Sequence, residues 1–152
     1  MNDLYQVLIK NMSGLDKAHG WLMASYQKCV KINLASELSL DELDALEALS
    51  SRFARVMDFL LQRVFRTIEE IELSSGGTLL DVIHRFQKRG FDLDEDRFRE
   101  MRELRNRISH EYVETLLSEM FKELLEFTPY LDHIIFQTQE YANKLLSRTP
   151  TP

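Results

Sequence analysis

The stretch from Ser39 to Leu73 constrains the fold of this chain more than any other. Its apolar residues recur at helical spacing and cover about half of the helix circumference, which is wider than the roughly 100° stripe of a surface helix. They are Phe53, Val56, Met57, Leu60, Leu61, Val64, Phe65, Ile68 and Ile71. A helix with so wide an apolar face must be covered on two sides or by a second subunit, so we expect it at the centre of a bundle.

The start of this central helix is marked by Ser39-Leu40-Asp41-Glu42, which has the form of a capping box. In that motif the serine oxygen accepts a backbone N–H and the glutamate side chain reaches back to the cap. We expect the helix to run to about Leu73, and the paired serines Ser50 and Ser51 leave open a break in its middle.

The apolar spacing before this helix predicts a helical region from about Asp3 to Ile32. Gly14 and Gly20 lie inside it and each weakens a helix by up to about 1 kcal/mol relative to alanine. One kinked helix and two shorter helices therefore both remain open for this region.

After the central helix, Ser74-Ser75-Gly76-Gly77 predicts a loop. It lacks the Gly-Lys-Ser/Thr sequence that a phosphate-binding loop requires. Thr78 then caps a short helix that runs to about Lys88, and Gly90 ends it. The run Asp92-x-Asp94-x-Asp96 imitates a calcium loop, but arginine stands at the position where the sharp turn needs glycine. We therefore expect Asp94 to cap a helix from Glu95 to about Tyr112.

The C-terminal part of the chain predicts a last helical region from Glu114 to about Leu146, which Pro129 breaks or kinks. No stretch has the alternation of a strand. The sequence thus predicts an all-α, up-down bundle of four to five helices, with one domain over residues 1–147 and a disordered tail over residues 148–152.

Composition limits the compartment and the partners. The 152 residues carry a net charge of −6 and one cysteine, Cys29, which cannot form an internal disulfide. The first residues lack a signal peptide pattern, and no apolar run is long enough for a membrane span. We therefore expect a cytoplasmic protein that does not enter a membrane.

The acidic net charge counts against broad binding of nucleic acid, which needs many cations. Cations nevertheless gather in one region: Arg85, Lys88, Arg89, Arg97, Arg99, Arg102, Arg105 and Arg107. Two interpretations stay open, a solvated helix face with ion pairs between nearby residues and a local patch that contacts phosphate.

The pattern Arg-Asn-x-x-x-His-x-Tyr, formed by Arg105, Asn106, His110 and Tyr112, is the most specific motif in the chain. It should occur by chance on the order of once in several thousand chains of this length. On the predicted helix, Met101, Leu104 and Ile108 share an apolar face, with Phe98 at its border. A second face, which we expect to look into a cleft, carries Arg102, Asn106, Ser109 and His110, and Arg105 and Tyr112 lie at the seam.

These residue types suit the cleavage of RNA without a metal. A histidine can transfer protons near neutral pH, and the fork of Arg105 matches phosphate oxygens. RNA supplies its own nucleophile, the 2′-hydroxyl, and the sequence shows no Cys/His set for a metal and no cofactor motif. On a helix, Arg105 and His110 lie about 140° apart. That angle suits a composite site between two subunits.

On these residues the chain resembles the HEPN superfamily of small α-helical proteins, and most closely its HepT-like branch. The resemblance covers the whole chain in helix layout and only Arg105 to Tyr112 residue by residue. It implies the toxin of a toxin–antitoxin pair, a homodimer whose Arg/His motifs line a shared cleft and act as a metal-independent endoribonuclease. It also implies that Asn106 orients or contacts the phosphate.

The resemblance further implies a partner, a minimal nucleotidyltransferase antitoxin that adds AMP to Tyr112. A bulky anion next to His110 would exclude an RNA phosphate. One departure is Glu111, an acid beside the imidazole, whose charge opposes RNA binding.

The leading hypothesis is thus a HepT-like ribonuclease toxin. In it His110 is the general base or acid and Arg105 the phosphate stabiliser; Arg102, Asn106 and Ser109 contact substrate, and Tyr112 is modified. The alternative is a non-catalytic partner that binds and presents substrate to a nucleotidyltransferase, which the acidic net charge and Glu111 favour. Under a third hypothesis the motif is merely structural.

Overall fold

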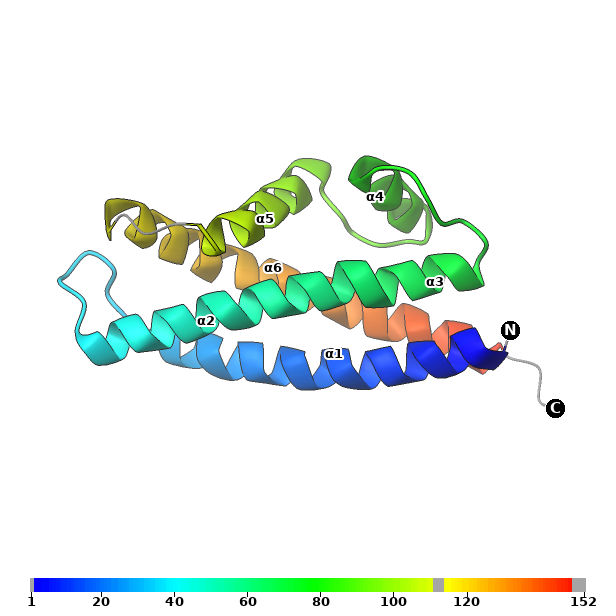
Figure 1. The fold of residues 1–152 in the computed structure, drawn as a ribbon, viewed down its shortest axis with the longest axis horizontal. Coiled ribbons are helices and arrows are strands. Elements are labelled where there is room, and N and C mark those ends of the chain that lie inside the picture. Colours follow the sequence, from blue (N-terminus) through cyan, green and yellow to red (C-terminus); the bar gives the residue numbers. More distant parts are fainter. Residues whose placement is uncertain (1, 111–113, 149–152) are drawn as a thin grey trace.

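The computed structural model describes residues 2–110 and 114–148, and over these residues it is helical with no strand (Figure 1). The helices are α1 (Asn2–Cys29), α2 (Leu40–Phe59), η1 (Leu60–Phe65), α3 (Arg66–Ile71), α4 (Leu79–Lys88), α5 (Glu95–Ile108) and α6 (Glu114–Ser147). The helix α2, the π-helical turn η1 and the helix α3 follow one another without a gap and form one long rod. The all-α class is confirmed.

The rod lies between other helices along the long axis of the molecule (Figure 1). α1 runs antiparallel to the rod, and α6 packs against both α1 and α2. α5 covers α2 and α6 from one side, and α4 lies beside it over the other end of the rod. This arrangement confirms an up-down helical bundle, while the dimer stays a prediction.

The central position predicted for the apolar stretch is confirmed. Its side chains Phe53, Val56, Met57, Leu60, Val64, Phe65 and Ile68 are all at most 1% exposed. The break left open at Ser50 and Ser51 does not occur, because the Ser50 hydroxyl donates to the Leu46 carbonyl at 3.0 Å inside an unbroken helix. The helix instead widens ten residues later into the π-helical turn η1, which the apolar spacing did not reveal.

α1 is one uninterrupted helix, so neither glycine divides it. Gly14 has a packing role that the sequence alone did not show. A Cβ at this position would lie 2.5 Å from Cζ of Phe59, so glycine allows α1 and α2 to approach closely there. The helix propensity lost at Gly14 is offset by this contact.

The predicted helix starts are confirmed. At each of three helices the side chain of the N-cap residue accepts a hydrogen bond from the backbone N–H three residues later, and the caps are Ser39, Thr78 and Asp94. These bonds satisfy N–H groups that have no partner within the helix. Asp94 therefore serves as a helix cap. Gly90 has a φ of +94°, a conformation that favours glycine, and it follows α4 as predicted.

The end of the motif helix was predicted wrongly. α5 ends at Ile108; Ser109 is its C-cap, and His110 lies in the following turn, where its N–H donates to the Arg107 carbonyl at 2.9 Å. The sequence after Ile108 offers serine, histidine, tyrosine and valine, which are weaker helix formers than the residues before it. Tyr112 and Glu111, like most of the predicted tail, lie outside the described residues.

Pro129 does not break the last helix, since α6 continues through it from Glu114 to Ser147. Proline removes one backbone donor from the helix. Next to it, the Thr128 hydroxyl donates to the Leu124 carbonyl at 2.6 Å within the helix.

Among the described residues, no helix is both long enough and apolar enough to cross a membrane.

Candidate functional site

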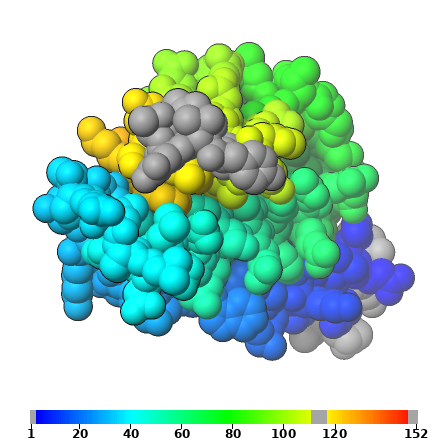
Figure 2. All heavy atoms as spheres, turned by 60° about the vertical axis from the view of Figure 1, so that its left-hand side comes forward, coloured from blue at the N-terminus to red at the C-terminus, as the bar shows by residue number. Residues whose placement is uncertain are grey.

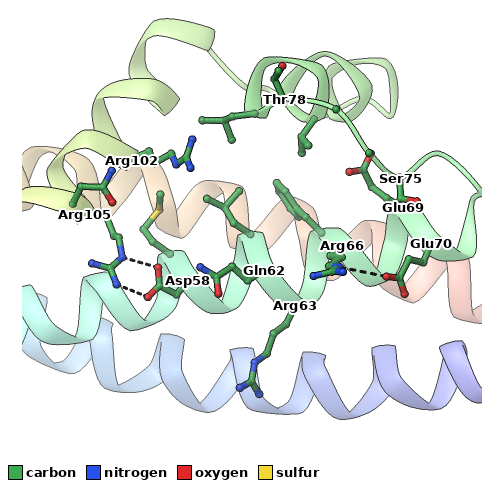
Figure 3. A pocket seen from close by; sticks show the side chains of 18 of the residues that line it. Asp58, Gln62, Arg63, Arg66, Glu69, Glu70, Ser75, Thr78, Arg102 and Arg105 are labelled. Carbon is green, nitrogen blue, oxygen red and sulfur yellow. Dashed lines mark hydrogen bonds and ion pairs between the residues drawn. The ribbon is translucent and has the colours of Figure 1, made fainter.

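A groove of about 1090 Å³ runs between the rod and the helices α4 and α5 (Figure 3). Five of the predicted site residues line it together: Arg102, Arg105, Asn106, Ser109 and His110. The polar face predicted for the motif segment therefore does look into a cleft. The sixth predicted residue, Tyr112, lies outside the described part of the chain.

The apolar face of α5 fixes the orientation of this polar face. Phe98, Met101 and Leu104 are completely buried and Ile108 is half-buried against the core, as the spacing predicted. Figure 2 looks onto the end of the molecule where the last turns of α5 and the first turns of α6 lie over the rod. Since α5 contacts α2 and α6 through its apolar side, Arg102 and Asn106 turn toward the groove.

Arg105 is held by a partner that the sequence reasoning missed. Its Nε and Nη2 atoms donate to the two carboxylate oxygens of Asp58, each at 2.6 Å, and Nη1 donates to the Ser109 hydroxyl at 3.4 Å (Figure 3). The bond to Asp58 raises the pKa of Arg105 further above its usual value, so the guanidinium stays charged. One signal was present in the sequence: Asp58 lies between Met57 and Phe59 and is the only acidic residue between Glu47 and Glu69.

Arg102 is the least engaged cation of the groove. Of the four arginines that the described residues place along it, Arg105 pairs with Asp58, Arg66 lies 3.4 Å from Glu70, and Arg63 stacks over the Phe59 ring. Among residues 2–110 and 114–148, Arg102 has no acidic or aromatic partner, and it points from α5 into the space between α4 and the rod (Figure 3). Its charge is available to an anion that enters the groove.

His110 reaches the groove from the turn after α5, with its side chain exposed. Because it lies beyond the helix, the angle of about 140° expected between Arg105 and His110 does not apply. A single chain brings both side chains to one groove. The helical geometry therefore no longer argues for a site shared by two subunits, and the shared cleft remains a prediction from the resemblance.

The cations around the motif are mostly used within the chain. Arg85 and Arg89 pair with Glu69 across the α3–α4 loop, Arg107 pairs with Glu123, and Arg97 lies over the Tyr130 ring at 4.0 Å. Of the ion pairs that these cations form among the described residues, the one between Arg99 and Glu95, at 3.1 Å, has the spacing of three or four residues that the solvated-face interpretation predicts. The ion-pair interpretation holds for most of the region, although its partners come from other helices. The arginines of this region that line the groove, and that could contact a phosphate there, are Arg102 and Arg105.

The remaining residues with reactive or ligating groups lie apart from this chemistry. Burial raises the pKa of the Cys29 thiol, which donates to the Ala45 carbonyl and does not line the groove. Within residues 2–110 and 114–148, no three His, Cys, Asp or Glu side chains are grouped as metal ligands.

Comparisons with models of protein families, with curated proteins and with solved structures found no match to this chain. What the site can do must therefore be argued from its own residues.

Proposed function

We propose that this chain is a HepT-like endoribonuclease that cleaves RNA without a metal, in the groove between α5 and the rod. The observation that carries the proposal is the composition of that groove. It contains an imidazole, a guanidinium oriented by a carboxylate, and a second guanidinium with no acidic partner, on His110, Arg105 and Arg102.

The proposed reaction uses the 2′-hydroxyl of RNA as the nucleophile. His110 accepts the proton of this hydroxyl as the O2′–P bond forms, and the P–O5′ bond breaks. The leaving O5′ takes a proton from water, so the products are a 2′,3′-cyclic phosphate and a 5′-hydroxyl. Arg102 and the Nη1 side of Arg105 stabilise the negative charge on the phosphoryl oxygens, and the Asn106 amide orients them.

The proposal extends to regulation and assembly. A minimal nucleotidyltransferase antitoxin adds AMP to Tyr112, which follows His110 by two residues in the chain. The added phosphate repels an RNA phosphate and its bulk obstructs the groove. A homodimer places two such grooves together. Support for this part comes from the motif Arg105-Asn106-x-x-x-His110-x-Tyr112 alone.

The test is induced expression of the wild type and of His110→Ala in a bacterial host, with growth and total RNA followed over time. We expect growth arrest and RNA fragmentation from the wild type and neither from the variant, because His110 supplies the proton transfer. The matched control is His133→Ala, which removes an exposed histidine of α6 that does not line the groove. Loss of the effect in both variants, or in neither, contradicts the proposal.

One observation favours the non-catalytic alternative, in which the chain presents substrate to a nucleotidyltransferase. The carboxylate of Asp58 neutralises Arg105, so the groove holds less free positive charge than the motif suggests. Purified wild-type protein that leaves RNA intact in the presence of EDTA, yet co-purifies with a nucleotidyltransferase, would establish this alternative.

A further inference from the structure

We propose that the middle of the groove is a subsite for one unpaired nucleobase, adjoining the phosphate contacts at Arg102 and Arg105. The inference rests on the proposed function, which places a phosphodiester at the α5 end of the groove, and it adds how the rest of the nucleotide is held.

The chemistry of the groove changes along its length. Arg102 and Arg105 lie at its α5 end, and Glu69 and Glu70 lie at its far end (Figure 3). His110, in the turn after α5, also lines the groove. Among the described residues, the arginines at this far end are already paired with those carboxylates, Arg85 and Arg89 with Glu69 and Arg66 with Glu70. A second phosphate therefore finds no unpaired cation there. One phosphate can bind at the α5 end, and an uncharged group suits the part of the groove that extends from it toward α3.

The stretch between the two ends is apolar and open. Leu61 of η1 and Leu79 and Val82 of α4 line it from opposite walls, and all three are only half-buried. Half-buried aliphatic side chains on facing walls offer both faces of a flat, uncharged ring a surface that excludes water. A base extended from a nucleotide whose phosphate lies at Arg102 fits this description.

An amide stands beside this apolar stretch. Gln62 is exposed, lines the groove and makes no hydrogen bond with another side chain in the described part of the chain (Figure 3). A free amide both donates and accepts hydrogen bonds, as the edge of a base requires. Gln62 and Leu61 belong to the π-helical turn η1. Such turns are rare in proteins, and those that occur are often found at functional sites.

The size of the groove and its few charges favour an unpaired nucleotide over a duplex. A volume of about 1090 Å³ is ample for a nucleotide, given that small-molecule sites span roughly 300–1000 Å³. A duplex is recognised through many phosphate contacts over two successive grooves. In the described part of the chain, Arg102 is the one arginine of this groove with neither an acidic nor an aromatic partner.

The experiment measures binding of the four nucleoside 5′-monophosphates, ribose 5-phosphate and inorganic phosphate to the purified full chain by calorimetric titration. We expect at least one nucleotide to bind about tenfold more tightly than ribose 5-phosphate, because only the nucleotide buries a base. Leu61→Ala and Gln62→Ala should each remove most of that difference and leave binding of ribose 5-phosphate unchanged. The matched control is Val7→Ala, a half-exposed valine of α1 outside the groove.

The inference is overturned if nucleotides and ribose 5-phosphate bind equally well, or if both groove variants, folded by circular dichroism, keep the preference for nucleotides. Monophosphates contain no bond for the proposed cleavage, so the result is independent of activity. Base-dependent binding by a chain that leaves RNA intact supports the subsite and refutes the ribonuclease. Cleavage of RNA without base-dependent binding supports the ribonuclease and refutes the subsite.

Discussion

Two clusters of arginine and carboxylate side chains lie on the rod, one at its junction with α4 and one in the groove at the end of α5, and they differ in how many of their polar groups are paired. We define the closed cluster as Glu69, Glu72, Arg85 and Arg89, at the junction of the rod with α4. The open cluster comprises Asp58, Arg102, Arg105 and His110, at the end of α5.

In the closed cluster nearly every polar group has a partner. The Glu69 side chain is 5% exposed and receives both arginines, and Arg89 also donates to Glu72 at 2.8 Å and to the Ser74 hydroxyl at 2.5 Å. Arg85 donates to the Gly76 carbonyl at 2.6 Å, which fixes the loop before α4. The rings of Phe65 and Phe86 stack with their centroids 3.9 Å apart and pack α4 against the rod.

In the open cluster only one ion pair is complete. Arg105 is bound by Asp58, whose side chain is 36% exposed, while Arg102 has no acidic partner and His110 lies in an exposed turn. The comparison teaches that arginines with the same chemistry serve structure where every donor is satisfied in a buried place. Where donors face solvent in a groove, they are available to a ligand, which is the basis of the proposed function.

The largest effect should come from breaking the closed cluster. Glu69→Ala leaves Arg85 and Arg89 without their buried partner, so we expect the free energy of unfolding to fall by about 3–5 kcal/mol. Urea denaturation measures the change. As a control, Glu95→Ala removes the exposed pair with Arg99 and should cost about 0.5 kcal/mol or less. Equal losses in the two variants would show that the closed cluster is not a stabilising unit.

In the open cluster, Arg102→Ala should change activity and spare stability. Removing a charge-assisted contact to phosphate should lower kcat/KM for RNA cleavage about 10- to 100-fold. The free energy of unfolding should stay within about 0.5 kcal/mol of wild type. The matched control is Arg66→Ala, a groove arginine already paired with Glu70, for which a smaller loss is expected. An equal loss in both variants would contradict a special role for Arg102.

A third variant removes the ion pair between Arg105 and Asp58 in the open cluster. Asp58→Asn keeps the shape of the side chain and releases Arg105 from its carboxylate. We expect KM for RNA to fall several-fold, because the groove loses a negative charge. We expect kcat to fall about tenfold, because Arg105 is no longer held in place. If kcat and KM are both unchanged while stability falls, Asp58 has a structural role only.

The smallest change in stability is expected for Tyr141→Phe, at the edge of the closed cluster. There the Tyr141 hydroxyl donates to Glu72 at 2.6 Å. Burial, followed by this hydrogen bond, raises the pKa of Tyr141. A raised pKa in the folded state stabilises the fold below the unfolded pKa of about 10, and this contribution is lost as pH rises through the folded pKa. Melting temperatures between pH 9 and 11.5 should therefore fall less steeply for Tyr141→Phe than for wild type.

At pH 7 the same variant should lose only about 1 kcal/mol, the value of one hydrogen bond. An alkaline profile parallel to that of the wild type would show that Tyr141 does not carry the pH dependence.

The sequence by itself determined the features of this protein that depend on neighbouring residues. The caps Ser39, Thr78 and Asp94, the buried face of the central helix and the buried face of α5 all follow from side chains within one or two turns of each other. The clustering of Arg102, Asn106 and His110 at one groove was predictable for the same reason, since they lie close together in the chain and away from the apolar face.

Only the tertiary structure decided which carboxylate each arginine binds. Asp58 and Arg105 are 47 residues apart, and Glu69 and Arg85 are 16 apart in different helices. An arginine in an unfolded chain can pair with any of the 25 acidic residues, and only the packing of the rod against α4 and α5 selects one. The π-helical turn η1 likewise depends on packing. Local preferences change too little there, over one or two residues, to fix a boundary.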